Sequence, residues 1–381
     1  MSKPPETSTD ENQGKISGNS AESLSQLSYA SDDASPQRPN WGFVGEFAKY
    51  SGMIAIFVIA IIVLRKKLGD ITLDKVLEGL QTIPPYQIGL ALLITGINFV
   101  VLTGYDLIAV RFLKKPLPLL KIMQGAVIGY ALSNVFGWLL GGNAVRYRLY
   151  TGFGFRFVEV VAFVSILSVT FWLGMFLLAG IAFVMLPVRL PEDYGEKLHF
   201  PLYVYGYLFL VCVMAYLIAT IVIRKPIRVG KESFPFPPFR MSLLQLAVSA
   251  CDFLLAALVL YVLLPPEAFQ APNVNYSTVL VSYLAAMVIV VATHMPGGFG
   301  VLEAVVISLL VDETAQDADG VKSLKNAVVC GLILFRVIYY LLPAVVAGIM
   351  FFMLEVRMKK PRAAAPAPSL ANESADMDPE I

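Results

Sequence analysis

The stretch Ser133–Arg156, SNVFGWLLGGNAVRYRLYTGFGFR, decides how the rest of the chain is interpreted. It places Arg146 and Arg148 beside a long apolar segment, and it contains the helix-breaking pair Gly141-Gly142. An arginine within or next to bilayer hydrocarbon is costly, so it usually faces a cavity, a partner or the headgroup layer. The stretch therefore indicates a membrane segment that is interrupted by polar residues.

The glycine pair is followed by the signals of a short helix. Asn143 is a favoured N-cap residue, and a helix from Ala144 to Tyr150 would stop at Gly152. Arg146 and Tyr150 are four residues apart and therefore share one face of that helix. The free N–H groups of the helix start, with an arginine close by, suit an anionic group such as a lipid phosphate. The alternative is a cytoplasmic loop whose arginines only follow the positive-inside rule.

The composition of the whole chain is that of a polytopic membrane protein. Of its 381 residues, 57% are hydrophobic and 15% are charged, whereas about 25% of the residues of soluble domains are charged. The net charge of +1 predicts no general affinity for nucleic acid. The three cysteines and two histidines have neither disulfide nor zinc spacing, and no Walker A or Gly-x-Ser-x-Gly sequence occurs. We therefore expect no metal, nucleotide or other cofactor.

Three parts are expected along the chain: a disordered tail at 1–45, a transmembrane domain at 46–356 and a second disordered tail at 357–381. Both tails are rich in polar residues or Ala and Pro, and both are poor in large apolar side chains. They cannot bury enough surface to fold alone. The beginning of the chain lacks the basic and then apolar pattern of a cleaved signal peptide.

About 20 apolar residues span a bilayer, and by this measure the transmembrane domain is all-α with about eight helical segments. Two of these segments, 117–150 and 276–311, are broken by glycines. The continuous spans are expected at 50–64, 86–110, 157–186, 201–223, 241–264 and 327–354, and an amphipathic segment at the interface is expected at 65–85.

The charges of the loops predict the orientation of these spans. Loop 224–240 carries five Lys and Arg residues and one acidic residue, whereas loop 265–275 carries no Lys or Arg. The first loop is therefore expected inside the cell, together with both termini. Segment 117–150 must then enter and return on the inside, and segment 276–311 on the outside. Two broken hairpins that open to opposite sides indicate an inverted repeat with a site near the midplane.

Ionisable residues within the spans are the candidates for that site. Asp106 is expected to pair with Arg146 or Arg148. Glu303 follows the Pro-Gly-Gly-Phe-Gly break, where the helix dipole favours a negative charge, and Arg336 is its expected counter-ion. The candidate substrate-binding residues are Asp106, Arg146, Arg148, Tyr150, Asp252, Glu303 and Arg336, and the structural breaks are Gly141, Gly142, Pro296, Gly297 and Gly298.

This charge pattern suits a lipid headgroup that carries both signs. A phosphate would meet Arg146, and an ammonium would meet one of the carboxylates Asp106, Asp252 and Glu303. Arg336 is also a candidate counter-ion for Asp252, which lies in mid-span, and Glu159 is expected at the membrane interface.

At three places the sequence resembles a known family. Tyr105-Asp106, the run GGNAVRYRLY at 141–150 and the run PGGFGVLE at 296–303 are similar to the transmembrane region of lysylphosphatidylglycerol synthases, also called multiple peptide resistance factors. The resemblance covers roughly 50–354. It implies a bacterial inner-membrane protein that moves aminoacylated phosphatidylglycerol between leaflets.

Full-length members of that family also carry a soluble domain that transfers lysine from lysyl-tRNA to phosphatidylglycerol. Only 27 residues follow Leu354 here, so we expect no lysyl transfer by this chain alone. The expected function is binding and flipping of phosphatidylglycerol-type lipid. Three alternatives stay open: a lysyltransferase or its membrane half acting with a separate aminoacyl-transferase protein, a small-solute secondary transporter, and a membrane scaffold. Transport without a nucleotide site would be downhill or ion-coupled, and the sequence leaves the oligomeric state open.

Overall fold

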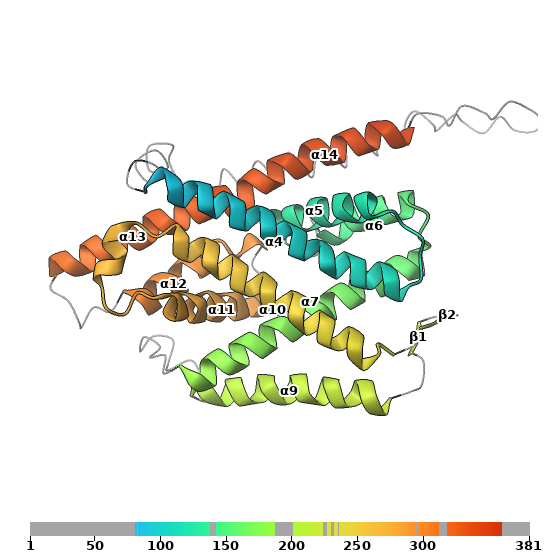
Figure 1. Cartoon of the computed structure of the whole chain (residues 1–381), viewed down its shortest axis with the longest axis horizontal. Coiled ribbons are helices and arrows are strands. Elements are labelled where there is room, and N and C mark those ends of the chain that lie inside the picture. The colour runs from blue at the N-terminus through green and yellow to red at the C-terminus, as the bar shows by residue number, and fades with distance from the viewer. Residues whose placement is uncertain are drawn as a thin grey trace, which may run out of the picture. The chain divides into compact units, whose positions relative to one another are not determined.

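The computed structural model is an all-α polytopic membrane protein, with one short β-hairpin in a connection (Figure 1). It describes residue 81 and residues 83–137, 142–186, 201–223, 227–229, 232–234, 236–293, 296–311 and 318–359. Within these ranges, seven helices are long and apolar enough to cross a membrane. The tail expected at 1–45, all but residues 357–359 of the tail expected at 357–381, the span expected at 50–64 and nearly all of the segment at 65–85 lie outside the described residues.

The described ranges contain the following helices, in chain order. They are α4 (Pro85–Phe112), α5 (Leu119–Phe136), α6 (Ala144–Gly152), α7 (Phe157–Met185), α9 (Leu202–Val222), α10 (Phe239–Val262), α11 (Tyr276–Thr293), α12 (Val301–Leu310), α13 (Ala318–Phe335) and α14 (Leu342–Lys359). The shorter elements are η2 (Pro266–Gln270), η3 (Pro296–Gly298), the π-helical segment η4 (Arg336–Leu341), and the antiparallel strands β1 (Ile227–Val229) and β2 (Glu232–Phe234).

Prolines define the starts of four of these helices. Pro84, Pro118, Pro201 and Pro238 stand at the N-cap positions of α4, α5, α9 and α10. Proline fixes φ and lacks the N–H group that would be unpaired in the first turn of a helix, so it is well tolerated there. These prolines therefore separate the apolar runs into distinct spans.

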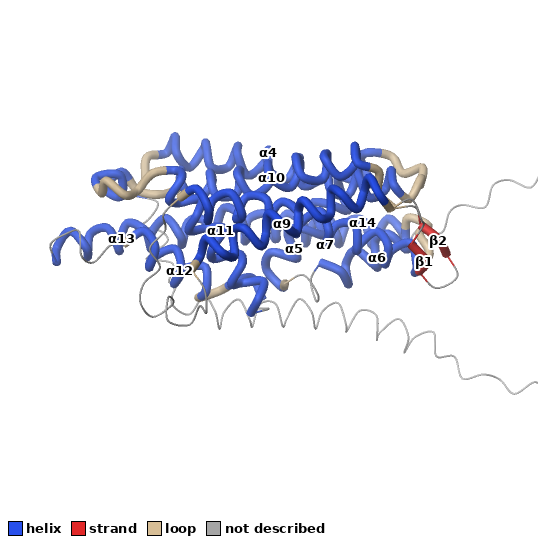
Figure 2. The backbone as a smooth tube through the Cα atoms, turned by 90° about the horizontal axis from the view of Figure 1, so that it is seen from below, coloured by secondary structure: helices blue, strands red, loops and turns tan. Residues whose placement is uncertain are grey.

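Helices α4, α7 and α10 form the centre of the bundle. Helix α10 packs against α4, α7 and α11, and α7 packs against α9. Figure 2 shows α4 and α10 side by side along the bundle. The buried face of α10 is partly polar up to Ser249, where it includes Gln245, and apolar from Phe253 to Leu260, with Asp252 between the two parts. Asp252 is therefore a buried carboxylate in the middle of a predicted membrane span, and it is one of the candidate site residues.

Two broken hairpins open to opposite ends of the bundle, as the sequence predicts. Hairpin α5/α6 lies between the end of α4 and the start of α7, and hairpin α11/α12 lies between the end of α10 and the start of α13 (Figure 1). The break of the second hairpin lies against the last turn of α5, since a Cβ atom on Gly297 would lie 3.0 Å from the carbonyl oxygen of Val135. Gly297, Gly298 and Gly300 have φ values of 65°, 60° and 81°, which only glycine adopts without strain.

The last helical run is longer than the predicted span at 327–354. It begins at Ala318 and continues through η4 to Lys359. The hydropathy of the sequence marks only its apolar middle, and the charged ends of the run at Asp319 and Glu355 fall outside that window. The π-helical segment inside it, which starts at Arg336, is a feature often found at functional sites.

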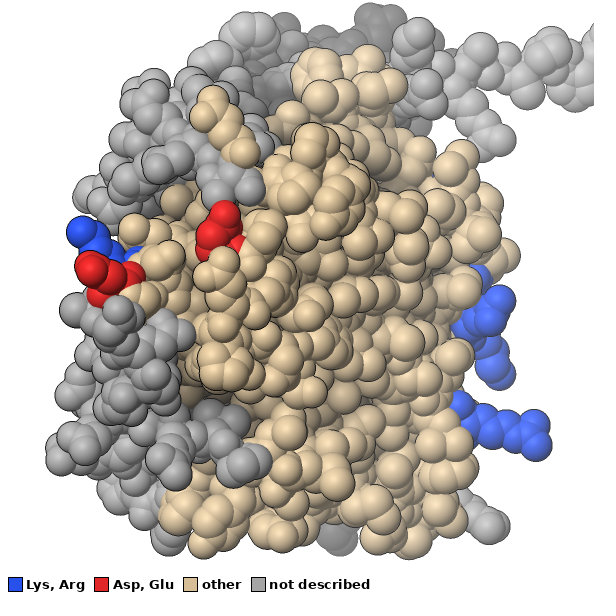
Figure 3. Space-filling view, turned by 60° about the vertical axis from the view of Figure 1, so that its left-hand side comes forward, with Lys and Arg blue, Asp and Glu red and all other residues tan. Residues whose placement is uncertain are grey.

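The charged side chains gather at the two ends of the bundle (Figure 3). The end where α4 finishes and α10 starts carries Arg111, Lys114, Lys121 and Arg240 as exposed cations. The opposite end carries a mixture that includes the exposed residues Glu267, Asp319, Lys322 and Lys325. This asymmetry has the sign that the positive-inside rule requires for the predicted orientation.

Candidate functional site

Helix α6 lies against two glycines of α5. A Cβ atom on Gly129 would lie 2.7 Å from Cζ of Arg146, and one on Gly125 would lie 2.8 Å from the hydroxyl of Tyr150. The two glycines and the two side chains share the same spacing of four residues, so each pair lies along one face of its helix. Glycine at both positions therefore lets the arginine and the tyrosine lie directly on the backbone of α5.

Asp106 of α4 completes this cluster. It is fully buried and accepts a hydrogen bond from the hydroxyl of Tyr150. Nη2 of Arg146 lies 3.7 Å from Oδ1 of Asp106, and the guanidinium lies 4.1 Å from the ring centroid of Tyr130. The ion pair expected for Asp106 thus forms with Arg146 and not with Arg148. We call Asp106, Tyr130, Arg146 and Tyr150 the hairpin cluster.

The hairpin cluster has spare hydrogen-bonding capacity. Arg146 is only 1% exposed, yet its Nε and Nη2 have no hydrogen-bond partner in the described part of the chain, and neither does Oδ1 of Asp106. The separation of 3.7 Å between Nη2 and Oδ1 is too long for a hydrogen bond. A buried group left without a partner costs about 1–3 kcal/mol, and a charged one costs more. The guanidinium is therefore placed to gain from an additional acceptor.

Arg148 belongs to a different environment. Its side chain is 51% exposed and forms an ion pair with Glu355 of α14. This contact ties the short helix α6 to the last helical run. The structure thus separates the two arginines, with one inside the hairpin cluster and one on the surface.

Asp252 occupies a second cluster, where α10 faces α4. Its Oδ2 accepts a hydrogen bond of 2.8 Å from the hydroxyl of Tyr105, and its Oδ1 accepts one of 3.2 Å from Nδ2 of Asn98. The same Nδ2 donates to the backbone carbonyl of Asp252 at 2.9 Å. No Lys or Arg of the described ranges pairs with this carboxylate, so Arg336 is not its counter-ion.

Arg336 holds the break of the second hairpin. Its Nε donates to Oε1 of Glu303 at 2.7 Å, and its two terminal nitrogens donate to the carbonyl oxygens of Gly297 and Gly298. The other oxygen of Glu303 accepts the N–H of Gly300 at 2.8 Å, which caps the start of α12. The sequence predicted this ion pair. In the structure both side chains also form hydrogen bonds to the backbone of the break.

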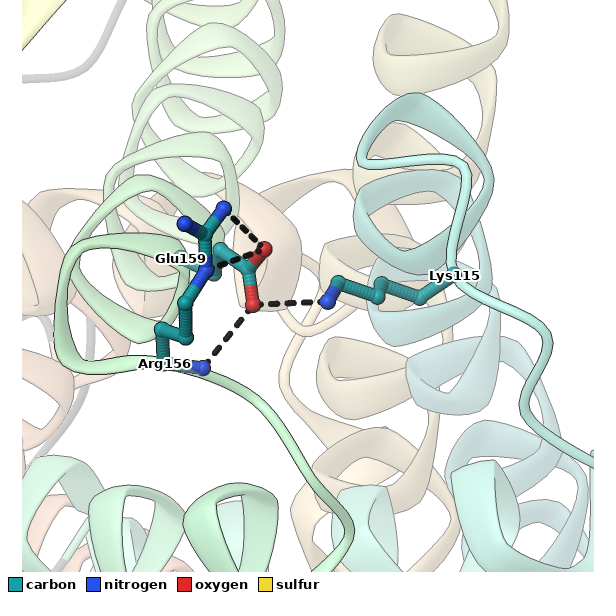
Figure 4. Close-up of polar contacts among 3 residues, drawn as sticks. All are labelled: Lys115, Arg156 and Glu159. Atoms are coloured by element: carbon teal, nitrogen blue, oxygen red, sulfur yellow. Dashed lines mark hydrogen bonds and ion pairs between the residues drawn. The ribbon is translucent and has the colours of Figure 1, made fainter. Parts of the chain in front are cut away.

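Glu159 joins two loops at the basic end of the bundle (Figure 4). Its carboxylate accepts from Nζ of Lys115 at 2.8 Å, from the backbone N–H of Arg156 at 2.8 Å and from Nη2 of Arg156 at 2.9 Å. The carboxylate thereby caps the first turn of α7 and fixes the loop after α6 to the loop after α4. The contacts of Glu159 therefore secure the base of the first hairpin.

One detail of the predicted helix start is wrong. Asn143 stands at the N-cap position of α6, but its side chain makes no capping hydrogen bond, because its backbone is already helical and follows a π-turn at Gly142. The predicted stop at Gly152 agrees with the end of α6. Gly141 lies outside the described residues, and the side chain of Pro296 is not described.

The sequence reasoning missed three polar contacts, those of Asn98, Tyr105 and Tyr130. Asn98 and Tyr105 are seven residues apart in α4, which is the spacing of one helix face, and this signal could have paired them with Asp252. Among the described residues, no three His, Cys, Asp or Glu side chains come together as metal ligands would.

The comparisons with known proteins agree with a membrane protein. No family model matches the chain. The chain is 32% identical over 307 residues to the Synechocystis protein named Uncharacterized protein slr0712. The aligned region covers 80% of this chain and 90% of that protein. This chain belongs to the family of slr0712.

Two further proteins are similar to this chain at lower identity. The inner membrane protein YbhN of Escherichia coli is 26% identical over 330 residues, which is 86% of this chain and 98% of YbhN. A phosphatidylglycerol lysyltransferase of Staphylococcus aureus is 25% identical over 302 residues, which is 78% of this chain but only 33% of that enzyme.

Proposed function

We propose that this chain binds phosphatidylglycerol-type phospholipids by their phosphate and moves them between the leaflets of the bacterial inner membrane. The observation that carries the proposal is the guanidinium of Arg146. It is buried at the break of a hairpin, and two of its nitrogens have no acceptor. The planar fork of a guanidinium matches the oxygens of a phosphate group, as it does those of a carboxylate, and a phospholipid brings such a phosphate into the membrane.

The burial of Arg146 argues against the simpler interpretation as a topology signal. A loop arginine that follows the positive-inside rule is exposed towards the headgroup layer, and the half-exposed Arg148 fits that interpretation. Arg146 instead lies on the backbone of α5 at Gly129, next to the fully buried Asp106. An ionisable residue in such a place, facing the interior of a membrane bundle, is a candidate for a substrate path.

The arrangement of the two hairpins supports movement as well as binding. The break of the second hairpin lies against the last turn of α5, and each hairpin opens to a different end. In transporters with inverted repeats, a site between two such elements is exposed first to one side of the membrane and then to the other. We propose the basic end as the cytoplasmic side, with both termini there.

The similarity to phosphatidylglycerol lysyltransferases supports phosphatidylglycerol or its aminoacylated form as the lipid. The similar region is a third of that enzyme's length. A second candidate function is therefore the membrane half of a lysyltransferase that acts with a separate aminoacyl-transferase protein. Formation of lysyl-lipid by the purified chain, or its co-purification with such a protein, would favour this second function.

The test is lipid movement in vesicles that contain the purified full chain. Fluorescent phosphatidylglycerol and its lysylated form are placed in one leaflet, and their appearance in the other leaflet is followed by chemical quenching. Arg146→Ala removes the charge-assisted hydrogen bonds, each of which contributes roughly 1.5–3 kcal/mol. One such bond corresponds to an about 10- to 150-fold loss of affinity, and we expect a loss of this order in the rate at low lipid concentration.

Two further variants make this result specific. Arg146→Lys keeps the charge but cannot give the planar two-pronged contact, so we expect only partial rescue. Arg240→Ala removes an exposed arginine at the start of α10 and should move lipid at the parent rate. If Arg146→Ala moves both lipids as fast as the parent at equal protein level, the proposal is wrong.

A further inference from the structure

Three intramembrane carboxylates differ in how their negative charge is compensated. Asp106 has Arg146 beside it, and Glu303 has Arg336. Asp252 has no cationic partner among the described residues, and its two oxygens are held by the neutral donors Asn98 and Tyr105. A buried carboxylate that meets only neutral donors is costly to keep ionised, and it gains from taking up a proton or a cation.

The neighbours of Asp252 on the packed elements are also neutral. Tyr130 of α5, Tyr283 of α11 and Tyr339 of η4 surround it at electrostatic range, in addition to Tyr105 of α4. Helix α9 has no acidic or basic residue, and the single one of α7, Glu159, lies in its first turn. Arg336 begins η4, but its guanidinium is used by Glu303 and by two carbonyl groups. Lys322 and Lys325 of α13, which also packs against α10, are exposed, and Arg146 lies beside Asp106. No cation of these elements forms an ion pair with Asp252.

Asn98 is suited to both protonation states of Asp252. Its Nδ2 donates to Oδ1 of Asp252, while its own Oδ1 is buried without a hydrogen-bond partner. A side-chain amide that turns over exchanges donor for acceptor. Asn98 can therefore donate to the ionised carboxylate, or turn over and accept the O–H of the protonated one at the cost of its hydrogen bond to the backbone carbonyl of Asp252.

A chain of contacts connects Asp252 to the hairpin cluster. The hydroxyl of Tyr105 donates to Asp252, and its ring packs on the ring of Tyr130 at 5.6 Å between centroids. The ring of Tyr130 in turn lies under the guanidinium of Arg146. If the proton instead binds Oδ2, this oxygen becomes a donor and the Tyr105 hydroxyl has to turn and accept, which places the change at the start of the chain of contacts that leads to Arg146.

We propose that Asp252 is a proton-binding site that couples the movement of an anionic lipid to the movement of one proton in the same direction. This inference rests on the proposed function and names its energy source. The carboxylate takes one proton from water on one side, which forms the O–H bond, and releases it to water on the other side. The proton removes a negative charge while the phosphate occupies the hairpin cluster, so that the two ligands favour each other's binding.

The test uses vesicles with a pH difference across the membrane. With one proton carried per lipid, a difference of about one pH unit should support an about tenfold excess of fluorescent phosphatidylglycerol in the leaflet that faces the more alkaline side. Protein-free vesicles give the background. Asp252→Asn keeps the shape of the side chain but cannot titrate, so it should abolish the excess. Asp252→Glu restores a titratable group and should retain it, as should Asp319→Asn at the exposed start of α13.

Three other outcomes would overturn the proposal. An equal excess with Asp252→Asn, or an excess on the acidic side, overturns the proposal. So does a pH response that occurs only with the lysylated lipid, because Asp252 would then be a site for the lipid ammonium.

A second measurement does not depend on transport. It tests the proton site even if no vesicle moves lipid, which is the result expected if the proposed function is wrong. A protonated carboxyl group has an infrared C=O band distinct from that of a carboxylate. The other Asp and Glu residues give bands that both proteins share, so we expect the difference between the spectra of the parent and of Asp252→Asn to contain one such band that titrates with pH. The same bands in both proteins at every pH would overturn the proton site.

Discussion

At the scale of single residues, the fit between α5 and Arg146 is the feature most open to a test. Gly129→Ala places a Cβ atom 2.7 Å from Cζ and 2.8 Å from Nε of the buried guanidinium. The arginine has to move, and overpacking of this kind costs about 1–3 kcal/mol of stability. We expect lower stability in thermal or denaturant unfolding, together with slower lipid movement, because the guanidinium leaves its position beside Asp106.

A matched glycine gives the control for this prediction. A Cβ atom on Gly96 in the middle of α4 has no other atom within 4 Å, and its φ is not in the left-handed region. Gly96→Ala should therefore stabilise the helix by about 0.5–1 kcal/mol. If Gly129→Ala behaves like Gly96→Ala, the close contact between α5 and Arg146 does not exist in the protein.

At the scale of elements, Arg336 and Arg146 should behave differently. Arg336 satisfies Glu303 and two carbonyl oxygens at the break of α11/α12, so its loss leaves three acceptors without their donor. Removing one member of a buried pair costs about 3–5 kcal/mol. Since the side chain of Glu303 is 28% exposed, we expect Arg336→Leu to destabilise the protein by about 3 kcal/mol, measured by reversible unfolding in detergent.

Two variants check that this loss comes from the break. Arg336→Lys keeps the charge but not the fork, and should be intermediate in stability. Lys322→Leu changes an exposed cation on the same helical run and should stay within about 0.5 kcal/mol of the parent. A double variant Arg336→Leu with Glu303→Leu should recover part of the loss, because no unpaired charge remains. Equal stability of Arg336→Leu and the parent would contradict the contacts at the break.

The same elements show what could be predicted from the sequence. The hairpins were predictable because Gly and Pro runs interrupt apolar segments, and the pairing of Glu303 with Arg336 was predictable because an unpaired charge in hydrocarbon is costly. The ends of the last helical run, 318–359, and its π-helical segment could not be predicted, because hydropathy shows only where the apolar residues lie. Tyr105 and Tyr130 were missed since tyrosines in apolar spans are usually packing or interface residues.

At the scale of the whole molecule, the orientation of the bundle is a prediction from the charges at its ends. The native cysteines Cys212, Cys251 and Cys330 are first replaced, because two of them are exposed. Lys121→Cys at the basic end should then react with an impermeant reagent only from the cytoplasmic side. Glu267→Cys in the connection before α11 should react only from the outside. Reaction of both positions from one side would contradict two hairpins that open to opposite faces.

The central claim is that the buried guanidinium of Arg146 holds a lipid phosphate, and native mass spectrometry of the purified protein tests it most directly. The parent protein and Arg146→Ala are extracted from the same cells in a mild detergent, with Arg240→Ala as the control. We predict that anionic phospholipid, above all phosphatidylglycerol or its aminoacylated form, stays bound to the parent and to Arg240→Ala and is lost from Arg146→Ala. Equal retention of anionic lipid by all three proteins, or retention of uncharged lipids alone, would contradict the claim.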